Sequence, residues 1–481
     1  MAEQYLKNKT VKGGVWSAID YIARYGISFI VGVILARLLT PNDYGLIGII
    51  TVFISLFRYI VDGGLGSALI RKLDADDDDY STMFFANLAV SIFLSLTLVL
   101  LSPFISIYFE REQLTLMTKV MSVIIVLDSL TMVQKVRLTK KIDFKTLARV
   151  SVSSSFISGI IGIVMAYLGC GVWALVGQHI SSSFFNSLFI WLNGKWIPKF
   201  VFRYEKFKEM WRFGWKILAS SIIGSLWDNL YSVIIAKNYS PVTLGHYSRA
   251  HQFANLCPST INSVVQRVSY PVLCNFQNDN AQLKKVYSKL IRVSMLPTFI
   301  LSLGLAACAE SFILVLIGEK WMPCVPYLQI LSFGIMLYPL HALNINVLQV
   351  VGRSDLTLYL RIIKTALATI PLLLGIFFNI YYMLWGSVFM GFISFIINAY
   401  FPGKLISYTI KEQLLDILPS FLVAVIMAVV VYSISFLQLS IYVTLLLQLV
   451  LGAVVAIILC ELTKLYEYQE LKQLIIKHFK K

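Results

Sequence analysis

Long apolar segments recur along the whole chain and alternate with short polar loops. A helix needs about 20 predominantly apolar residues to cross a bilayer, and four segments exceed this without interruption. In hydrocarbon every backbone N–H and C=O must be paired within the segment, so such segments are helical. The clearest of them cover residues 82–107, 381–401, 414–436 and 440–462. The sequence therefore predicts an all-α polytopic membrane protein.

The remaining apolar segments bring the predicted number of spans to fourteen. Two of these ten additional segments, 14–38 and 250–272, are interrupted by polar groups. Composition supports this class, because only 14% of the 481 residues are charged, against about 25% in soluble domains. The ten further predicted spans are 14–38, 45–66, 114–136, 147–168, 171–192, 213–237, 250–272, 288–317, 325–351 and 358–379.

Lysine and arginine residues concentrate in alternate loops. They are dense in 135–149, 195–212, 284–289 and the tail 464–481, and sparse in the intervening loops. Cytoplasmic loops of membrane proteins are enriched in basic residues, so both termini are predicted to be cytoplasmic. The same rule accounts for the net charge of +16 without invoking nucleic acid as a partner.

An internal repeat relates the two halves of the chain. The segments ILARLLTPNDYG and IIAKNYSPVTLG begin 200 residues apart, so that Pro41 and Gly45 match Pro241 and Gly245. Each segment leads from the first span of a set of six into the second, which predicts two lobes in a parallel repeat. The predicted divisions are an N-terminal lobe over 1–195, a C-terminal lobe over 196–402, and two added spans with a basic tail over 403–481.

Charged residues inside predicted spans are the candidate functional groups, since a charge at mid-bilayer costs about 2.5–3.5 kcal/mol. Asp20 and Arg24 are four residues apart in the first span, as are Arg58 and Asp62 in the second. One interpretation is that each is a self-neutralised pair on one helix face. The other is that both arginines line a shared cavity and bind an anion, with the aspartates orienting the guanidinium groups.

Further polar groups occur in the seventh and eighth predicted spans. Arg249 and Arg267 lie near the ends of the eighth span, where arginine also snorkels to lipid headgroups. His179, alone in the sixth span, is interpreted as a packing residue. The full set of candidate cavity residues is Asp20, Arg24, Arg58, Asp62, Lys216, Asp228, Arg249, Asn255, Asn262 and Arg267.

Sequence signatures of several enzyme classes are missing. The chain has no P-loop and no serine nucleophile elbow, and its six cysteines form no C-x-x-C pair. The acidic run at 74–79 is interpreted as a cytoplasmic loop in preference to a metal site. We therefore expect a protein without catalytic residues, cofactor or metal.

Five segments together resemble the Wzx-type flippases of the multidrug/oligosaccharidyl-lipid/polysaccharide (MOP) exporter superfamily, nearest the colanic-acid-exporter-like branch. They are ARLLTPNDYGLIGI, DGGLGSALIRK, GCGVWALVGQ, GEKWMPCVPYLQIL and VGRSDL. The resemblance implies two six-helix lobes around a cavity that opens alternately to the two faces of a bacterial inner membrane. It implies a polyprenyl-diphosphate-linked oligosaccharide as the substrate, with membrane lipids and polysaccharide polymerase machinery as partners.

The resemblance also implies roles for particular residues. Cavity arginines from the first, second and eighth spans of family members hold the diphosphate, which fits Arg24 and Arg58 and leaves the third arginine open. A proton or sodium gradient is the implied driving force. The candidate coupling residues are Asp20, Asp62, Asp128, Asp228 and Glu310.

Two other functions remain to be compared with this one. A cation-coupled drug exporter of the same superfamily would favour acidic cavity residues, so Arg24 and Arg58 argue against it. An integral-membrane polysaccharide polymerase or glycosyltransferase would need a large extracytoplasmic loop or a soluble domain. The longest predicted loops are about 20 residues and lie on the cytoplasmic side.

Overall fold

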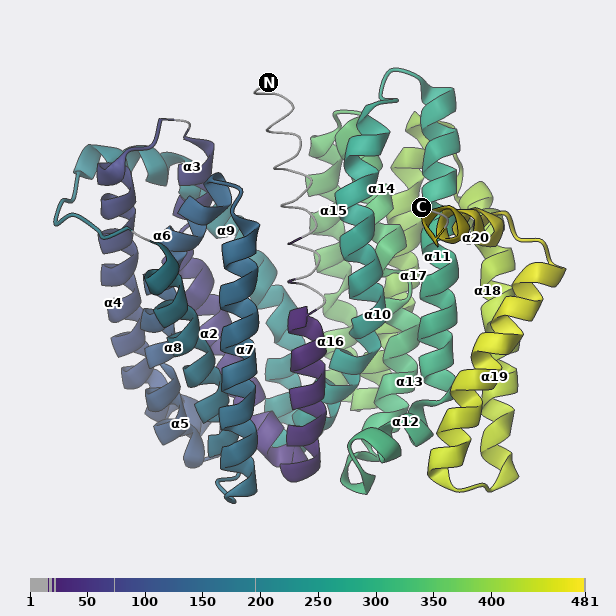
Figure 1. Ribbon diagram of the computed structural model, residues 1–481, viewed down its shortest axis with the longest axis horizontal. Coiled ribbons are helices and arrows are strands. Elements are labelled where there is room, and N and C mark those ends of the chain that lie inside the picture. Colours follow the sequence, from purple (N-terminus) through teal and green to yellow (C-terminus); the bar gives the residue numbers. More distant parts are fainter. Residues whose placement is uncertain (1–15, 17–19, 21–22, 73, 195, 480–481) are drawn as a thin grey trace. The chain divides into compact units, whose positions relative to one another are not determined.

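The computed structural model describes residues 16, 20, 23–72, 74–194 and 196–479 (Figure 1). Within these ranges every regular element is a helix. The chain forms two compact units, Met1–Gly245 and His246–Lys481, which are described separately below. The predicted lobe boundaries at 195 and 402 stay a prediction.

The first unit begins with a helix over residues 23–38, which is the described part of the predicted first span. It continues with α2 (Pro41–Asp62), α3 (Leu65–Arg71), α4 (Asp77–Phe109), α5 (Gln113–Met121), α6 (Val123–Lys140), α7 (Phe144–Tyr167), α8 (Trp173–Gly194), α9 (Tyr204–Asn238) and the start of α10 (Pro241–Cys274).

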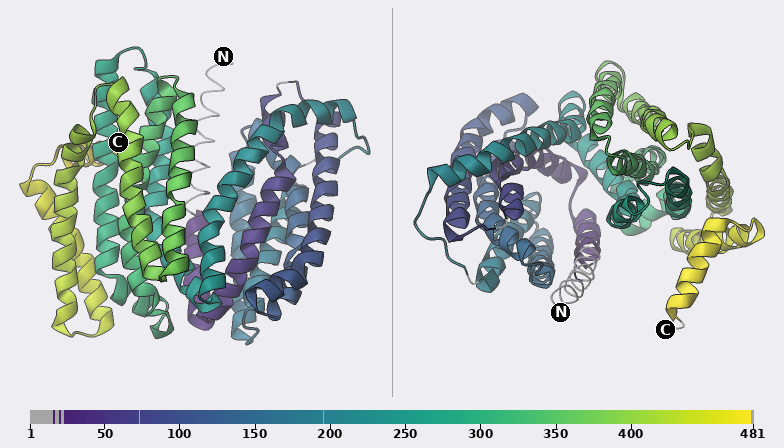
Figure 2. Two further views of the ribbon diagram at one scale, coloured as in Figure 1. Left: turned by 180° about the vertical axis from the view of Figure 1, so that it is seen from behind. Right: turned by 90° about the horizontal axis from the view of Figure 1, so that it is seen from above.

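The second unit contains the rest of α10 and two short 3₁₀ helices among its α-helices. Its elements are α11 (Asn280–Ala307), α12 (Ala309–Leu316), η1 (Glu319–Trp321), α13 (Cys324–Ile335), α14 (Tyr338–Val350), α15 (Ser354–Leu367), α16 (Thr369–Phe377), α17 (Ile380–Leu405), α18 (Ile410–Ser433), η2 (Ile434–Leu437), α19 (Ile441–Leu462) and α20 (Tyr466–Phe479). The helices α18 and α19 form an antiparallel pair, drawn in yellow-green and yellow in Figure 2.

In the described residues, eleven helical segments are long and apolar enough to cross a membrane, each at the place of a predicted span. The chain is therefore a multi-pass membrane protein. The helix over 23–38, α8 and α10 occupy the places of the other three predicted spans but do not belong to these eleven. The exact number of fourteen spans stays a prediction.

The start of α2 is specified by local hydrogen bonding. Pro41 is the first residue of the helix, where its missing N–H costs nothing. Ahead of it, the Thr40 hydroxyl accepts a hydrogen bond from the Asp43 backbone N–H at 3.3 Å, and the Asp43 carboxylate accepts one from the Thr40 N–H at 2.8 Å. This reciprocal capping box fixes the beginning of the helix.

The predicted span over 45–66 lies within Pro41–Arg71, a segment long and apolar enough to cross a membrane, but the helix is broken inside it. Gly63 and Gly64 both have positive φ, 57° and 69°, which ends α2 and turns the chain into the short helix α3. Two successive left-handed residues are accessible without strain only to glycine. The apolar run continues through this bend, which is why hydropathy alone did not reveal it.

The matching residues of the internal repeat pack against each other. A Cβ atom added to Gly45 would lie 1.7 Å from the carbonyl oxygen of Pro241, and one added to Gly245 would lie 1.9 Å from that of Pro41. Because each glycine lacks a side chain, the backbone at the start of the opposing helix can approach it closely. The superposition of two lobes in a parallel repeat stays a prediction.

A stripe of large side chains along α11 forms the core of the second unit. Leu283, Tyr287, Ile291, Met295 and Phe299 recur every four residues and are all at most 1% exposed. They pack against α13, α14 and α18. Because helical residues four apart share a face, this stripe positions the other three helices around α11.

Candidate functional site

Arg58 and Asp128 form an ion pair in the first unit. Arg58 on α2 places its Nε 2.5 Å from Oδ2 of Asp128 on α6, with the two side chains 47% and 19% exposed. The predicted pairing of Arg58 with Asp62 is wrong. Asp62 ends α2, and its carboxylate is directed at the backbone N–H groups of Gly64 and Gly66 at the start of α3.

Other basic side chains surround this ion pair. Lys135 on α6 is close enough to Asp128, Arg58 and Arg24 to interact electrostatically with all three. His179 on α8 has the same relation to Arg58 and Asp128. We call Arg24, Arg58, Lys135 and His179 the basic cluster. Within the described residues, its interactions involve a single carboxylate, Asp128, so the cluster carries excess positive charge.

The cluster is exposed to solvent although Arg58 and Lys135 belong to segments that are apolar enough to cross a membrane. Arg24 and Lys135 are exposed, and His179 is partly exposed. Protein nevertheless surrounds Lys135 and His179 on most sides. The cluster therefore combines partial exposure to solvent with packing by neighbouring side chains.

Two cluster members were not identified as site residues from the sequence. Lys135 was assigned to the loop at 135–149, but α6 continues to Lys140 and contains it. His179 was interpreted as a packing residue. Its proximity to the Arg58–Asp128 pair depends on how α8 packs against α6, for which the sequence holds no local signal.

Asp20 and Arg24 do not form the predicted ion pair. Asp20 instead accepts a hydrogen bond from the Ser151 hydroxyl on α7. Arg24 lies 5.9 Å from the ring of the adjacent Tyr25, and no acidic side chain in the described part of the chain is within ion-pair distance of it. Of the ten predicted site residues, the structure brings Arg24 and Arg58 together.

The predicted residues on α9 and α10 have other environments. Lys216 is exposed and takes part in no ion pair among the described residues. Arg249 is only 6% exposed and donates from Nη1 to Gln252 Oε1 at 2.5 Å. The prediction that it lies near a helix end is wrong, because α10 begins at Pro241 and extends two turns before it.

The remaining candidate residues lie on α9, α10 and α12, and none of them is described in contact with the basic cluster. Asn255 and Asn262 are half-buried in α10, and Oδ1 of Asn262 has no hydrogen-bond partner among the described residues. Glu310 is exposed in the first turn of α12. The side chains of Asp228 and Arg267 lie outside the described part of the structure.

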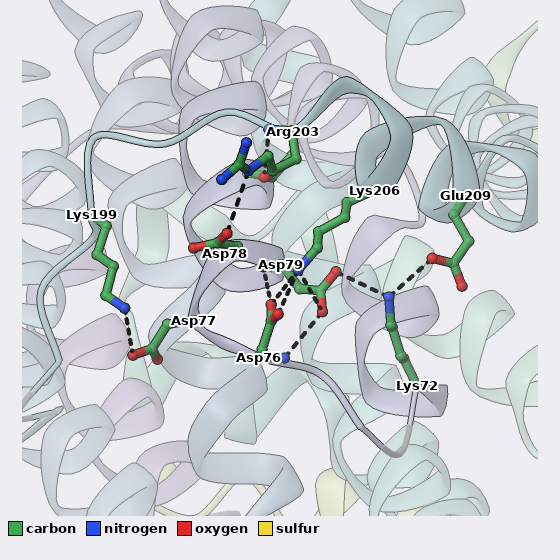
Figure 3. A network of polar contacts seen from close by, with 10 residues as sticks. Lys72, Asp76, Asp77, Asp78, Asp79, Lys199, Arg203, Lys206 and Glu209 are labelled. Carbon is green, nitrogen blue, oxygen red and sulfur yellow. Dashed lines mark hydrogen bonds and ion pairs between the residues drawn. The ribbon is translucent and has the colours of Figure 1, made fainter.

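The acidic run begins a helix and is held by ion pairs (Figure 3). Asp76 caps α4 and lies 2.6 Å from Lys206, while Lys72 lies 3.1 Å from Asp79 and 2.9 Å from Glu209. The hydrogen bond from Lys206 holds the pKa of Asp76 well below its usual range. Burial opposes charging of Lys72, but its bonds to Glu209 and Asp79 raise its pKa overall.

This network joins the start of α4 to the start of α9, so its role is structural. Two further pairs extend it, Arg203 with Asp78 at 3.5 Å and Lys199 with Asp77 at 3.6 Å. The interpretation of the run as a solvated loop is therefore corrected. A group of three or more metal-ligating side chains is not found among the residues that the structure describes.

Comparison with known proteins identifies the family. A family profile described as "Polysaccharide biosynthesis protein" matches residues 34–326, more than half of the chain. The chain belongs to this family. It is 24% identical over 434 residues to the teichuronic acid biosynthesis protein TuaB of Bacillus subtilis, covering 89% of this chain and 90% of TuaB.

Two more similarities agree with this membership. The lipopolysaccharide biosynthesis protein WzxC of Escherichia coli is 24% identical over 372 residues, which cover 77% of this chain and 76% of WzxC. The structure of the lipid II flippase MurJ in an inward closed conformation superposes with a TM-score of 0.74 at 15% identity, covering 95% of this chain and 99% of MurJ.

A multidrug transporter of the MATE family aligns less closely, with a TM-score of 0.61 at 16% identity over 82% of this chain and 98% of the transporter. At such identities the structural likeness shows the fold alone. The resemblance to Wzx-type proteins that the sequence predicted agrees with the family match and with this fold.

Proposed function

We propose that the protein flips a polyprenyl-diphosphate-linked oligosaccharide from the cytoplasmic to the periplasmic leaflet of a bacterial inner membrane by alternating access. Both termini lie in the cytoplasm in this proposal. The names of the relatives support it, since they describe cell-surface polysaccharide biosynthesis and, for MurJ, a lipid II flippase. The observation that carries it is the basic cluster around Asp128.

A diphosphate cannot enter hydrocarbon unaided, because it would lose its hydration without compensation. The basic cluster offers replacements for those water contacts. Arg24, Arg58 and Lys135 are cationic donors, and charge-assisted hydrogen bonds to phosphate are about twice as strong as neutral ones. The guanidinium forks also match the geometry of phosphate oxygens. The polyprenyl chain remains in the bilayer while the headgroup crosses.

Asp128 is the coupling residue in this mechanism. The other candidates have different tasks: Asp20 accepts from Ser151, Asp62 faces the amides of α3, and Glu310 is exposed at a helix start. Among the candidates whose side chains the structure describes, Asp128 alone forms an ion pair with a cluster arginine. Binding of a proton to Asp128 would release Arg58 to the diphosphate, and loss of that proton would retrieve it. A sodium ion at the same carboxylate would act in the same way.

The competing functions fit the site less well. A drug exporter for organic cations would need a cavity with excess negative charge. In the described residues, the basic cluster instead sets two arginines and one lysine against a single carboxylate, that of Asp128. A polymerase or glycosyltransferase would need catalytic groups on an extended loop. The longest described connection in the first unit is residues 196–203, between α8 and α9. Two of its side chains, Lys199 and Arg203, form ion pairs with α4.

A deletion strain complemented with single variants tests the proposal. Arg24→Ala, Arg58→Ala and Lys135→Ala should each reach normal protein levels yet reduce polysaccharide export, with the lipid-linked precursor accumulating in the cytoplasmic leaflet. Lys119→Ala is the matched control, because Lys119 is an exposed lysine on α5 outside the cluster. Wild-type export from all three cluster variants would overturn the proposal.

Proteoliposomes separate the flippase from the drug exporter. The purified protein should move a fluorescent undecaprenyl-diphosphate sugar between leaflets. It should not increase ethidium transport above the level in liposomes without protein. Gradient-driven ethidium transport without lipid movement would establish the alternative.

A further inference from the structure

A polar pocket of about 610 Å³ lies between α3 and the first turns of α9 in the first unit. This volume falls in the range of small-molecule sites, about 300–1,000 Å³. The lining is separate from the basic cluster. Its polar groups are Arg71, Lys72 and Asp74 at and after the end of α3, and Glu209 and Arg212 on α9.

The two helices that form the pocket are fixed against each other at both ends of α3. A Cβ atom added to Gly64, the residue before α3, would lie 2.3 Å from the carbonyl oxygen of Gly214 on α9. The two backbones therefore touch at the beginning of α3. At its other end, Lys72 lies 2.9 Å from the carboxylate of Glu209 (Figure 3). The pocket is thus formed before any ligand binds, which lowers the entropic cost of binding.

Two arginines of the pocket have no acidic partner. Arg71 and Arg212 are exposed, and no carboxylate lies within ion-pair distance of either among the residues that the structure describes. The Arg71 guanidinium lies 4.7 Å from the ring centroid of Phe213 on α9. This cation–π contact restrains the guanidinium and leaves its N–H donors to other acceptors. Because the lining holds three cations and two carboxylates, it carries excess positive charge.

Exposed aromatic side chains accompany the pocket along α9. Tyr204, Trp211 and Trp215 are exposed and recur at intervals of seven and four residues, so they share one helix face. Tyrosine and tryptophan are enriched where membrane proteins pass from hydrocarbon to headgroups. Arg212 follows Trp211 directly on the neighbouring face. The aromatic face and the pocket therefore lie at the same level of α9.

The length of α9 also places this end of the helix among lipid headgroups. Its 35 residues extend about 52 Å at 1.5 Å per residue, about 20 Å more than a hydrocarbon core of about 30 Å. Charged residues are concentrated at the N-terminal end, at positions 205, 206, 208, 209 and 212, so the excess length belongs there. Phosphate groups of the bilayer are then within reach of the pocket.

We propose that the pocket binds the phosphate diester of an anionic glycerophospholipid from the surrounding bilayer. Arg71 and Arg212 bind the non-bridging phosphate oxygens, and the lipid chains lie along the aromatic face of α9. The excess positive charge favours a glycerol headgroup over a choline headgroup, whose ammonium group would be repelled. Basic pockets between transmembrane helices near the membrane surface are suited to such headgroups. The lipid is a resident ligand that joins α3 to α9, and it is not the transported substrate.

Binding of phosphatidylglycerol to the purified full-length protein in detergent tests the inference, with phosphatidylcholine, inorganic phosphate and pyrophosphate as the other probes. Phosphatidylglycerol should raise the melting temperature of the wild type, because a ligand that binds only the folded state stabilises it. Phosphatidylcholine and inorganic phosphate at the same concentration should not. The variant Arg71→Gln/Arg212→Gln should lose about 10- to 100-fold in affinity for phosphatidylglycerol.

Two further variants control for charge and for folding. Arg111→Gln/Arg149→Gln removes two exposed arginines that do not line the pocket, and it should bind phosphatidylglycerol like the wild type. Arg71→Lys/Arg212→Lys keeps the charges but loses the bidentate geometry, so its affinity should lie between those of the wild type and the glutamine variant. The lysine variant also keeps the test decisive if the glutamine variant is unstable.

Three results would overturn the inference. The first is equal stabilisation of the wild type by phosphatidylglycerol and phosphatidylcholine, and the second is unchanged phosphatidylglycerol affinity in the glutamine and lysine variants. The third is stabilisation by inorganic phosphate as strong as that by phosphatidylglycerol, which would identify a site for free phosphate. Pyrophosphate affinity should be the same in the wild type and the glutamine variant, because the basic cluster is left intact. Its loss would assign the pocket to a diphosphate in place of a lipid.

Discussion

The double variant Arg58→Gln/Asp128→Asn decides whether Arg58 serves the substrate or only its neighbour. In the structure the Arg58 Nε lies 2.5 Å from Asp128 Oδ2, and the two side chains are 47% and 19% exposed. A pair this accessible contributes about 0–1 kcal/mol to stability. Removing both charges with residues of similar shape should therefore leave the melting temperature nearly unchanged.

The effect on binding should be much larger. A charge-assisted hydrogen bond is worth about 1.5–3 kcal/mol, which corresponds to about 10- to 150-fold in affinity. Both Arg58→Gln and the double variant should lose that much affinity for pyrophosphate. Asp128→Asn alone should bind pyrophosphate at least as tightly as the wild type, because Arg58 is freed, but should export little polysaccharide.

The assays are pyrophosphate binding to the purified protein and polysaccharide export at matched protein level, with Lys119→Gln as the control for loss of an unrelated cation. If Arg58 only neutralises Asp128, the double variant will recover both wild-type affinity and wild-type export. That recovery would refute the assignment of Arg58 to the diphosphate.

Three other predictions concern packing, pH and topology. Gly45→Ala should destabilise the protein by about 1–3 kcal/mol, because its methyl group meets the opposing proline carbonyl, whereas Gly26→Ala has nothing within 4 Å and should be neutral in thermal melts. Lys206→Gln should lower stability by an amount that is constant above about pH 4 and shrinks below it, since the lowered pKa of Asp76 stabilises the fold only while Asp76 is ionised; a difference that persists at lower pH would contradict this. Lys199→Cys in a cysteine-free background should resist an impermeant maleimide added to intact cells, and labelling would refute the cytoplasmic position of this loop.

The positions of most helices were predictable because hydropathy reports burial in lipid directly. The predicted spans over 381–401 and 440–462 correspond to α17 at Ile380–Leu405 and α19 at Ile441–Leu462. The breaks inside spans were not predictable, since an apolar run can continue through a bend such as Gly63–Gly64. The helix α20 was missed because its residues are amphipathic and not apolar as a whole.

The candidate site was predictable only in part, for a related reason. The energetic penalty of a charge in lipid identifies Arg24 and Arg58 from the sequence alone. It does not identify their partners: helix spacing offers Asp62 to Arg58, while the packing of α2 on α6 brings Asp128, 70 residues away, into contact. Lys135 was missed because the predicted span ended one residue after it and its charge was counted with the loop.

Shared use of Arg58 has a thermodynamic consequence. The guanidinium cannot make its full set of hydrogen bonds to Asp128 and to a diphosphate at once, so binding of the anion and binding of a proton to Asp128 favour each other. Such coupling is reciprocal: if a proton on Asp128 raises the affinity for the anion, the anion raises the affinity of Asp128 for the proton by the same factor. Pyrophosphate should therefore cause the wild-type protein to take up a fraction of a proton, measurable as a buffer-dependent heat of binding. Asp128→Asn should show only the heat that comes from ionisation of pyrophosphate itself. Equal proton uptake by both proteins would separate substrate binding from Asp128 and assign the coupling to another carboxylate.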